Sequence, residues 1–190
     1  MRTITDKGGE TFLGRTWHFL WKSDSIWSWL VDLALLYLIV KFIFFPLLSL
    51  TFGTALPSVI VESSSMHHTG DIDGWWRSYG WWYEQKELTK EQVSQWDFMK
   101  GINKGDIIVV FGVKNISMGD VIIYNAGQQK PIIHRVVSLN PIQTKGDNNQ
   151  GQLQFEYNIK QEQVIGKAVL RIPKLGWIKL VFVEIFKLGK

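Results

Sequence analysis

The sequence predicts a mainly β protein in which a transmembrane helix near the N-terminus precedes a compact, coiled β-sheet domain. A long, predominantly apolar run begins at Ile26 and is long enough to cross a bilayer. From Gly105 onward, short runs rich in β-branched residues alternate with turn residues, a pattern typical of a small β domain. A Trp-rich, partly helical insert and a C-terminal amphipathic helix complete the expected architecture.

The composition limits the kinds of protein this chain can be. Its 190 residues allow one modest domain plus an anchor. The absence of cysteine excludes a disulfide scaffold, a thiolate zinc site and a cysteine nucleophile. The net charge of +4 is spread among acidic residues and forms no concentrated basic stripe, so we expect no nucleic-acid partner.

The anchor is expected within residues 26–56, with Leu33 to Phe52 in the membrane. A buried core helix seldom stays apolar over such a length, and a cleaved signal peptide would be shorter and begin earlier. Asp32 and Lys41 interrupt the run on opposite faces of the helix, so they cannot pair with each other. Pro46 is expected to kink the outer half because it lacks a helical hydrogen bond.

The segment before the anchor, residues 1–25, carries basic residues and aromatic residues that suit a membrane interface. A basic flank favours an N-terminus in the cytoplasm. We therefore expect a single-pass protein of the cell membrane, with everything beyond the anchor outside the cytoplasm.

Residues 57–174 are predicted to form the extracytoplasmic β domain. β-branched content and run length predict its strands. The expected strands are Ser58–Val61, Ile107–Phe111, Val121–Tyr124, Ile132–Leu139, Ile142–Lys145 and Val164–Ile172.

The insert, residues 67–104, is crowded with Trp and Tyr. Such side chains suit either a local core or the bilayer interface, and the sequence does not decide between these alternatives. Thr89 and Gln92 have the spacing of a capping box, which predicts a helix from Lys90 to about Met99, ended by Gly101. The C-terminal segment 175–190 is too short to span a bilayer and is expected to be an amphipathic helix, either on the membrane surface or packed on the β domain.

The candidate chemistry centres on the serine run that follows the first predicted strand, Ser63-Ser64-Ser65-Met66. Such a run alone is most often a solvated turn. A serine nucleophile needs a base and donors that hold the developing oxyanion. Of the four histidines, His134 lies in a predicted strand, and the next strand leads into the loop Lys145–Asn149. Asp147 in that loop could orient the imidazole, although the loop could equally be an ordinary turn.

A metal site is one interpretation of the segment after the serines, because imidazole and carboxylate groups bind zinc. The candidates are His67, His68, Asp71 and Asp73. Their spacing fits no familiar site, and adjacent histidines do not easily converge on one ion. We therefore expect no metal and no other cofactor.

Several sequence blocks occur in a characteristic order. They are Ser63-x-Ser65-Met66, Gly105-Asp106-Ile107-Ile108-Val109-Val110, Gly119-Asp120-Val121-Ile122, His134-Arg135-Val136 and Lys145-Gly146-Asp147-Asn148-Asn149. With these blocks the chain resembles the type I signal peptidase family, and the histidine of the fourth block resembles the archaeal and endoplasmic-reticulum branch rather than the bacterial enzymes. The resemblance covers the anchor and most of the chain from Pro57 onward, but not the insert.

The resemblance implies a membrane-anchored serine endopeptidase of signal-peptidase fold that removes signal peptides from exported preproteins. It implies that Ser65 is the nucleophile and His134 the general base. Ser63, together with the backbone N–H of Ser65, would form the oxyanion hole. Asp147 would complete the triad.

The chain also departs from the family pattern. His68 stands where a proline is usual, and Gln152-Leu153 occupy the place of a further aspartate found in eukaryotic members. Three alternatives therefore remain for the third group: Asp147, which we prefer, Glu156, or a Ser-His dyad.

The expected partners are preprotein signal peptides, the lipid membrane and the protein translocation machinery. A noncatalytic membrane subunit that binds signal peptides or a translocation partner is the main alternative function. A self-cleaving regulator of related fold and a metal-dependent enzyme are further alternatives.

Overall fold

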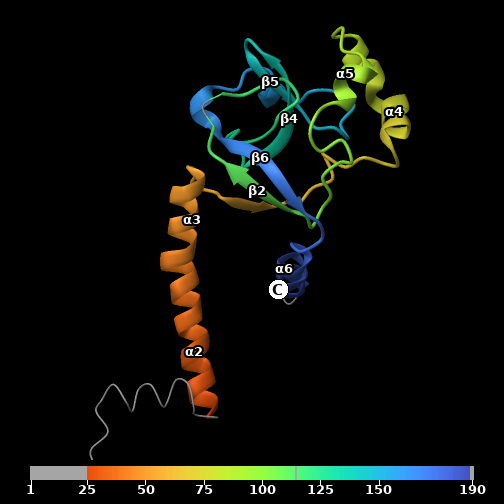
Figure 1. Ribbon diagram of the computed structural model, residues 1–190. Coiled ribbons are helices and arrows are strands. Elements are labelled where there is room, and N and C mark those ends of the chain that lie inside the picture. Colours follow the sequence, from red (N-terminus) through yellow and green to blue (C-terminus); the bar gives the residue numbers. More distant parts are fainter. Residues whose placement is uncertain (1–24, 114, 189–190) are drawn as a thin grey trace, which may run out of the picture. The chain divides into compact units, whose positions relative to one another are not determined.

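The computed structural model describes residues 25–113 and 115–188. The predictions for residues 1–24, including their basic and interfacial aromatic residues, lie outside the described residues. The chain divides into two compact units, Met1–Leu48 and Ser49–Lys190, which are described separately here. Figure 1 shows the helices of the anchor and the sheet of the second unit.

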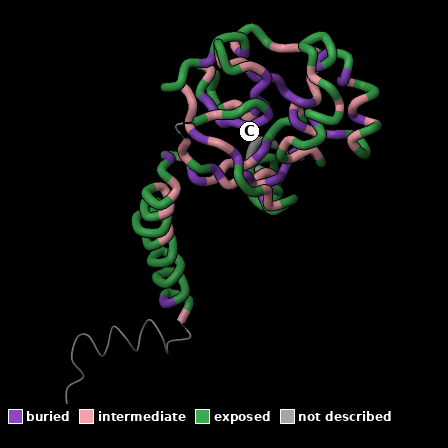
Figure 2. The backbone as a smooth tube through the Cα atoms, turned by 45° about the horizontal axis from the view of Figure 1, so that its top comes forward, coloured by how far each residue is buried: buried purple, intermediate pink, exposed green. Residues whose placement is uncertain are grey.

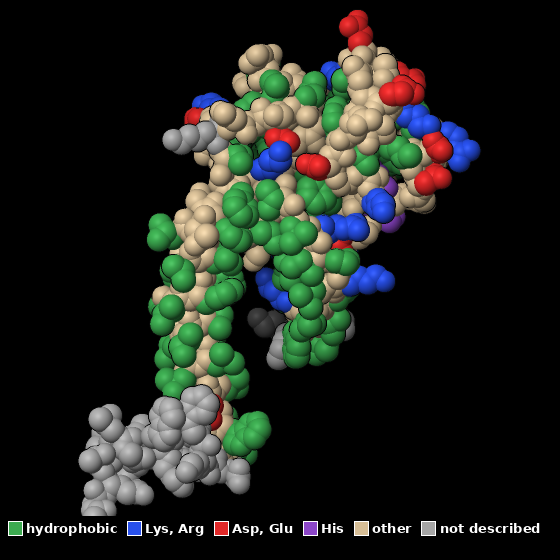
Figure 3. Space-filling model, viewed as in Figure 1, with side chains coloured by type: hydrophobic (Ala, Val, Ile, Leu, Met, Phe, Trp, Pro, Cys, Tyr) green, Lys and Arg blue, Asp and Glu red, His purple; other side chains and the backbone are tan. Residues whose placement is uncertain are grey.

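The apolar run forms one continuous helical stretch, made of α2 (Ile26–Ile39), the π-helical turn η1 (Val40–Phe44) and α3 (Phe45–Phe52). It begins at Ile26, the first residue of the expected anchor segment, with Ser25 as its N-cap. Over Ile26–Phe52 the mean hydropathy reaches 2.4, and none of the most apolar stretch is buried. Figure 3 shows hydrophobic side chains on the surface of this helix. By length and composition, the helix can cross a membrane.

The distortion expected at Pro46 occurs one turn earlier, as the π-helical turn Val40–Phe44. The N–H of Phe45 donates to the carbonyl of Val40, five residues back. Proline has no N–H to donate, and its ring pushes away the carbonyl four residues before it. A π-helical turn ahead of Pro46 accommodates this loss within a continuous helix.

The second unit contains a six-stranded sheet in which every pair of neighbouring strands is antiparallel. The strand order is β1-β2-β6-β3-β4-β5. The strands are β1 (Ser58–Ile60), β2 (Ile107–Phe111), β3 (Val121–Tyr124), β4 (Ile132–Leu139), β5 (Ile142–Lys145) and β6 (Val164–Ile172), with short 3₁₀ turns η2 (Gln154–Glu156) and η3 (Gln161–Gln163) before β6. The predicted mainly β fold is confirmed.

A Gly-Asp pair lies directly before each of the strands β2 and β3. Gly105 and Gly119 both have a φ of 87°, a conformation that favours glycine. Each following aspartate then closes a turn onto a backbone N–H three residues before it: Asp106 accepts from Asn103 at 2.8 Å and Asp120 from Ser117 at 2.9 Å. Turn geometry thus explains why a glycine is followed by an aspartate at both places.

Strand β3 is buried along its whole length. Figure 2 shows buried segments in the interior of the unit that contains the sheet. Alternate side chains point to opposite faces of a strand. Val121 and Ile123 accordingly pack with Met66 and Ile108 in one apolar cluster. Ile122 and Tyr124 belong to a second cluster on the other face. Both faces of the coiled sheet are therefore covered.

The aromatic insert forms a local core against the sheet. Its main helix is α4 (Ile72–Glu84), with Asp71 as N-cap. Trp75, Trp82 and Tyr83 are buried together with Val93 of the insert and Val137 of β4. Of the two alternatives, the structure therefore shows a packed core for these aromatic rings.

The second helix of the insert, α5 (Lys90–Ser94), has the predicted capping box between Thr89 and Gln92. Its predicted end at about Met99 is wrong, because the helix stops at Ser94. Beyond it the carbonyl of Asp97 accepts a hydrogen bond of 2.8 Å from Arg135, so that group is used for tertiary packing and not for a further helical turn.

The C-terminal segment forms α6 (Trp177–Leu188), as expected. Apolar side chains at helical spacing, Ile178, Phe182 and Ile185, are each about 60% exposed (63%, 60% and 58%). This face of α6 is not packed on the described part of the β domain.

Candidate active site

The serine turn, residues Ser63–Met66, follows β1 and is held at both ends. Val61 exchanges backbone hydrogen bonds with Gly105 and Asp106, and the carbonyl of Met66 accepts from the N–H of Ile102 at 2.8 Å. The Met66 side chain is buried in the core, whereas Ser65 is only half-buried. The turn therefore presents Ser65 at the surface from a fixed backbone.

The loop Lys145–Asn149, which follows β5, lies directly against the serine turn. The backbone N–H of Asn148 donates to the carbonyl of Ser65 at 2.7 Å, and its side-chain amide donates to the carbonyl of Ser64 at 3.1 Å. The N–H of Asp147 contacts the sulfur of Met66 at 3.5 Å. Two segments that lie some eighty residues apart in sequence are thus joined at the candidate site.

Gly146 lies close to both the imidazole ring of His134 and the carbonyl oxygen of Ser65. A Cβ added to Gly146 would lie 2.8 Å from Nε2 of His134 and 2.9 Å from the carbonyl oxygen of Ser65. Only glycine fits between them. Within the described residues, Oγ of Ser65 is hydrogen-bonded to Oγ of Ser63 at 3.1 Å, and no hydrogen bond joins it to His134.

His134 is buried on β4, and its Nδ1 lies 2.5 Å from Oε1 of Glu156. Glu156 is fully buried, and its other oxygen accepts from the N–H of Leu153 at 2.6 Å. A carboxylate accepts only, so Nδ1 is the donor and Nε2 of the neutral ring is left as an acceptor. That acceptor is the atom beside Gly146 and Ser65.

A short polar chain continues behind Glu156. Thr144 Oγ1 lies 3.4 Å from Oε1 of Glu156 and 2.9 Å from the hydroxyl of Tyr124. Burial raises the pKa of Tyr124 above its ordinary value, against the opposing effect of the Thr144 hydrogen bond. Tyr124 therefore stays neutral in this chain at any physiological pH.

Asp147 has different partners from those we expected. Its carboxylate receives a bidentate pair of hydrogen bonds from Arg135, at 2.9 and 2.7 Å, and lies 2.8 Å from Nε2 of His68. Burial alone would raise the pKa of Asp147, but the charge of Arg135 and hydrogen bonds from His68 and Arg135 hold that pKa well below its usual range. Asp147 is thus a buried, ionised partner of Arg135.

The reason for the difference lies in strand β4. His134 and Arg135 are neighbours, and successive residues on a strand project to opposite faces of a sheet. His134 therefore meets Glu156 on one face while Arg135 meets Asp147 on the other. The preferred role of Asp147 as the partner of His134 does not agree with this geometry, whereas the alternative residue Glu156 occupies that position.

Lys145 is fully buried at the start of the same loop. Its Nζ donates to the carbonyl of Gly146 at 3.0 Å and lies over the rings of Tyr79, Trp82 and Tyr83, at 5.6, 5.3 and 5.2 Å from their centroids. Burial lowers the pKa of Lys145 to about 8, although Asp147 and Glu156 act in the opposite direction.

The residues considered as metal ligands each have a different hydrogen-bond or ion-pair partner. His67 bonds Asn103 at 2.5 Å, His68 joins Met99 and Asp147, Asp71 caps α4, and Asp73 pairs with Lys90. Within residues 25–113 and 115–188, no group of three or more His, Asp or Glu side chains is arranged to hold a metal ion.

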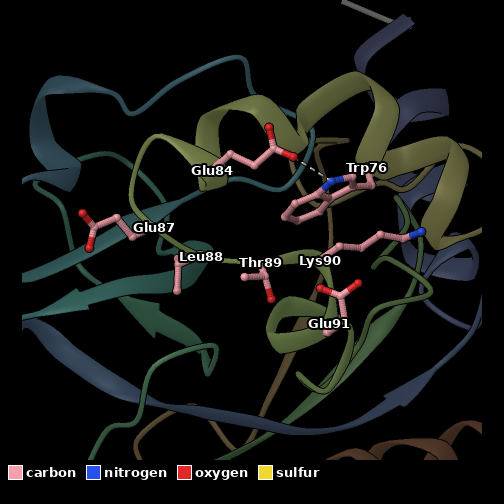
Figure 4. Close-up of a pocket in the computed structure, with 7 residues that line it drawn as sticks. All are labelled: Trp76, Glu84, Glu87, Leu88, Thr89, Lys90 and Glu91. Carbon is pink, nitrogen blue, oxygen red and sulfur yellow. Dashed lines mark hydrogen bonds between the residues drawn. The ribbon is translucent and has the colours of Figure 1, made fainter.

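A cavity of about 390 Å³ lies in the insert (Figure 4). Its lining residues are Trp76, Glu84, Glu87, Leu88, Thr89, Lys90 and Glu91. The indole N–H of Trp76 donates to Glu84 at 3.2 Å. None of the predicted site residues lines this cavity.

Sequence reasoning missed the structural roles of Arg135, His68 and Asn148. Arg135 and Asn148 belong to the same sequence blocks as His134 and Asp147. Their place in these blocks could have indicated that they also contribute to the site. His68 gave no such signal, because its contacts with Asp147 and with the ring of Trp75, 4.6 Å away, depend on the fold of the insert.

No family model matches the chain. The chain is similar to several proteins named signal peptidase complex catalytic subunit SEC11. It is 30% identical over 96 residues to that of Colletotrichum graminicola, covering 43% of this chain and 56% of the relative. It is 32% identical over 89 residues to that of Plasmodium falciparum, covering 40% and 48%, and 28% identical over 100 residues to that of Komagataella phaffii, covering 43% and 58%.

The chain spans about half the length of the curated relatives it matches. These similarities agree with the resemblance carried by the ordered sequence blocks and with the mainly β fold behind an apolar helix. Over 40–43% of its length the chain is therefore similar to proteins named signal peptidase complex catalytic subunit.

Proposed function

We propose that this protein is a membrane-anchored serine endopeptidase, a type I signal peptidase, that removes N-terminal signal peptides from secreted preproteins. The observation that carries the proposal is the contact of Glu156 with Nδ1 of His134, which leaves Nε2 as a proton acceptor beside Ser65. The similarity to catalytic subunits of signal peptidase complexes supports the choice of substrate.

In the proposed mechanism, Ser65 attacks the carbonyl carbon of the last residue of the signal peptide, and the N-terminal amine of the mature protein is the leaving group. His134 takes the hydroxyl proton and then returns it to the leaving amine. Water next attacks the acyl-enzyme, again with His134 as base, and releases the free peptide. Because the Ser65 hydroxyl is bonded to Ser63, the first step requires that this hydroxyl be redirected toward His134.

The oxyanion and the imidazolium that form in this reaction both need stabilisation. The hydroxyl of Ser63, close to Ser65, and the backbone N–H of Ser65 are the proposed donors to the oxyanion. Glu156 holds the imidazole in the required tautomer and stabilises its positive charge. Asp147 has a supporting role, because its carboxylate is bonded to Arg135 and His68.

The helix Ile26–Phe52 would hold this site near a membrane surface. A signal peptide is cleaved just beyond its apolar region, so the cutting serine must lie close to the bilayer. Ser65 follows the end of α3 by a short stretch of chain. We propose a cytoplasmic N-terminus and a catalytic domain on the other side of the membrane, on the basis of the basic residues in segment 1–25.

The test is processing of a preprotein by the full chain in membranes. Ser65→Ala and His134→Ala should each abolish cleavage while the protein stays folded, whereas Ser78→Ala on the exposed face of α4 should cleave at the wild-type rate. Wild-type activity in either of the first two variants would overturn the mechanism.

A second measurement separates this function from a noncatalytic signal-peptide-binding subunit. A serine-reactive acylating probe should label Ser65 in the wild type and leave Ser65→Ala unlabelled. A wild-type protein that binds signal peptides without being labelled would favour the noncatalytic subunit.

A further inference from the structure

The insert touches the loop Lys145–Asn149 at several consecutive places. The indole N–H of Trp75 donates to the carbonyl of Asp147 at 3.0 Å, and the hydroxyl of Tyr79 donates to Oδ1 of Asn148 at 2.6 Å. Tyr79 also lies under the ammonium group of Lys145. Helix α4 therefore packs on the loop that carries the contacts to the serine turn.

The contact between Tyr79 and Asn148 has a consequence for Ser65. A primary amide has one acceptor end and one donor end. With its oxygen occupied by the Tyr79 hydroxyl, Asn148 turns its Nδ2 toward the carbonyl of Ser64, at 3.1 Å. The opposite orientation of the amide would place two oxygens against each other.

The same residue fixes the nucleophile through its backbone, since the N–H of Asn148 donates to the carbonyl of Ser65 at 2.7 Å. One chain of hydrogen bonds thus runs from Tyr79 through Asn148 to the peptide units of Ser64 and Ser65. The 2.6 Å bond from Tyr79 is the shortest of the three, and Tyr79 is only half-buried.

We propose that Tyr79 is a positioning residue, through which the Trp-rich insert holds Asn148 and thereby the backbone of Ser65. This inference rests on the proposed function for its catalytic consequence. Its structural part, the restraint of the serine turn, does not depend on catalysis.

The experiment compares Tyr79→Phe with Tyr83→Phe in the full-length protein. Both variants lose one hydroxyl from helix α4 and keep the ring. The hydroxyl of Tyr83 is buried near Asp147, and among the described residues no hydrogen bond joins it to Asn148, so Tyr83→Phe removes a hydroxyl from the same helix without removing the contact to Asn148.

Amide hydrogen exchange of segment 62–68 reports on the restraint itself. Tyr79→Phe should raise exchange in this segment by about three- to tenfold, the range for one lost hydrogen bond. Tyr83→Phe should leave it unchanged. Equal exchange in the wild type and Tyr79→Phe would overturn the proposal, whether or not the protein is an enzyme.

Acylation of Ser65 by the serine-reactive probe and cleavage of a preprotein report on the catalytic consequence. Tyr79→Phe should lower kcat and the acylation rate about three- to tenfold, with KM and the pH dependence of the rate unchanged, because His134 and Glu156 are untouched. An unchanged kcat would contradict this part.

A double variant checks that Tyr79 acts through Asn148. Tyr79→Phe combined with Asn148→Ala should be no slower than Asn148→Ala alone. Additive losses would show that Tyr79 acts by another route. If the wild type showed no acylation while its exchange pattern followed the prediction, the proposed function would fail and the restraint by Tyr79 would stand.

Discussion

Oε1 of Glu156 lies 2.5 Å from Nδ1 of His134, in a position where both side chains are almost completely buried. This contact determines which ring nitrogen carries the proton. The second carboxylate, that of Asp147, is not bonded to His134. It forms an ion pair with Arg135, which projects from the other face of β4. The two carboxylates should therefore respond differently to substitution.

Gly146 separates Ser65 from His134, and its replacement tests how closely they must approach. In Gly146→Ala the new Cβ would meet the His134 ring, the Ser65 carbonyl and the Asn149 amide at 2.6–2.9 Å, so the site must open. A displacement of about 1 Å can cost about 10²-fold in rate, and we expect a loss of that size in preprotein cleavage. Gly151→Ala is the control, since its Cβ would meet nothing within 4 Å. A Gly146→Ala enzyme as fast as Gly151→Ala would show that Ser65 and His134 do not work across this gap.

Asp147→Asn should mainly reduce stability. The change leaves Arg135 and His68 buried without their anionic partner, and breaking a buried pair typically costs about 3–5 kcal/mol in the free energy of unfolding. Because the folded-state pKa of Asp147 is lowered, its contribution is complete above the unfolded value of about 3.9 and is lost as the pH falls below it. Denaturant unfolding at several pH values measures this.

The difference between wild type and Asp147→Asn should thus be full at pH 7 and shrink below about pH 4. Glu162→Gln, an exposed change in the 3₁₀ turn η3, should alter stability by less than about 0.5 kcal/mol. A constant difference across this pH range would contradict the ionised state assigned to Asp147.

Lys145→Met tests the buried lysine under the aromatic rings of the insert. Burial lowers the pKa of Lys145 from 10.5 to about 8 in the folded protein. Between these values the unfolded chain binds a proton that the folded protein has released, so the wild type gains stability relative to Lys145→Met as pH rises. Unfolding curves measured from pH 7 to 10.5 should show this. The exposed Lys160→Met should not change the slope, and parallel curves for wild type and Lys145→Met would contradict the prediction.

Much of the fold could be predicted because local patterns determined it. The β-branched runs after Gly105 gave the strands of the sheet, and the capping pair Thr89 and Gln92 gave the start of α5. The alternatives for the insert could not be separated in this way, since Trp and Tyr suit a core and a membrane interface equally. Trp75, only 1% exposed, is buried by contacts with residues far away in sequence.

The site could be predicted in part for the same reason. Ser65, His134 and the loop with Asp147 stand in recognisable blocks, and the structure brings these segments together. The choice between Asp147 and Glu156 depends on which face of β4 each approaches. Glu156 arrives from a 3₁₀ turn beyond a long loop, and no local pattern determines where such a turn packs.

The most direct test of the central claim is the cleavage rate of Glu156→Gln, measured beside Asp147→Asn on the same preprotein and expressed per folded molecule. In the proposed mechanism the change removes the charge that stabilises the His134 imidazolium, so the rate should fall about 10²–10⁴-fold. Asp147→Asn, where folded, should keep a rate much closer to the wild type. The opposite ranking, with Glu156→Gln active and folded Asp147→Asn inactive, would contradict the account.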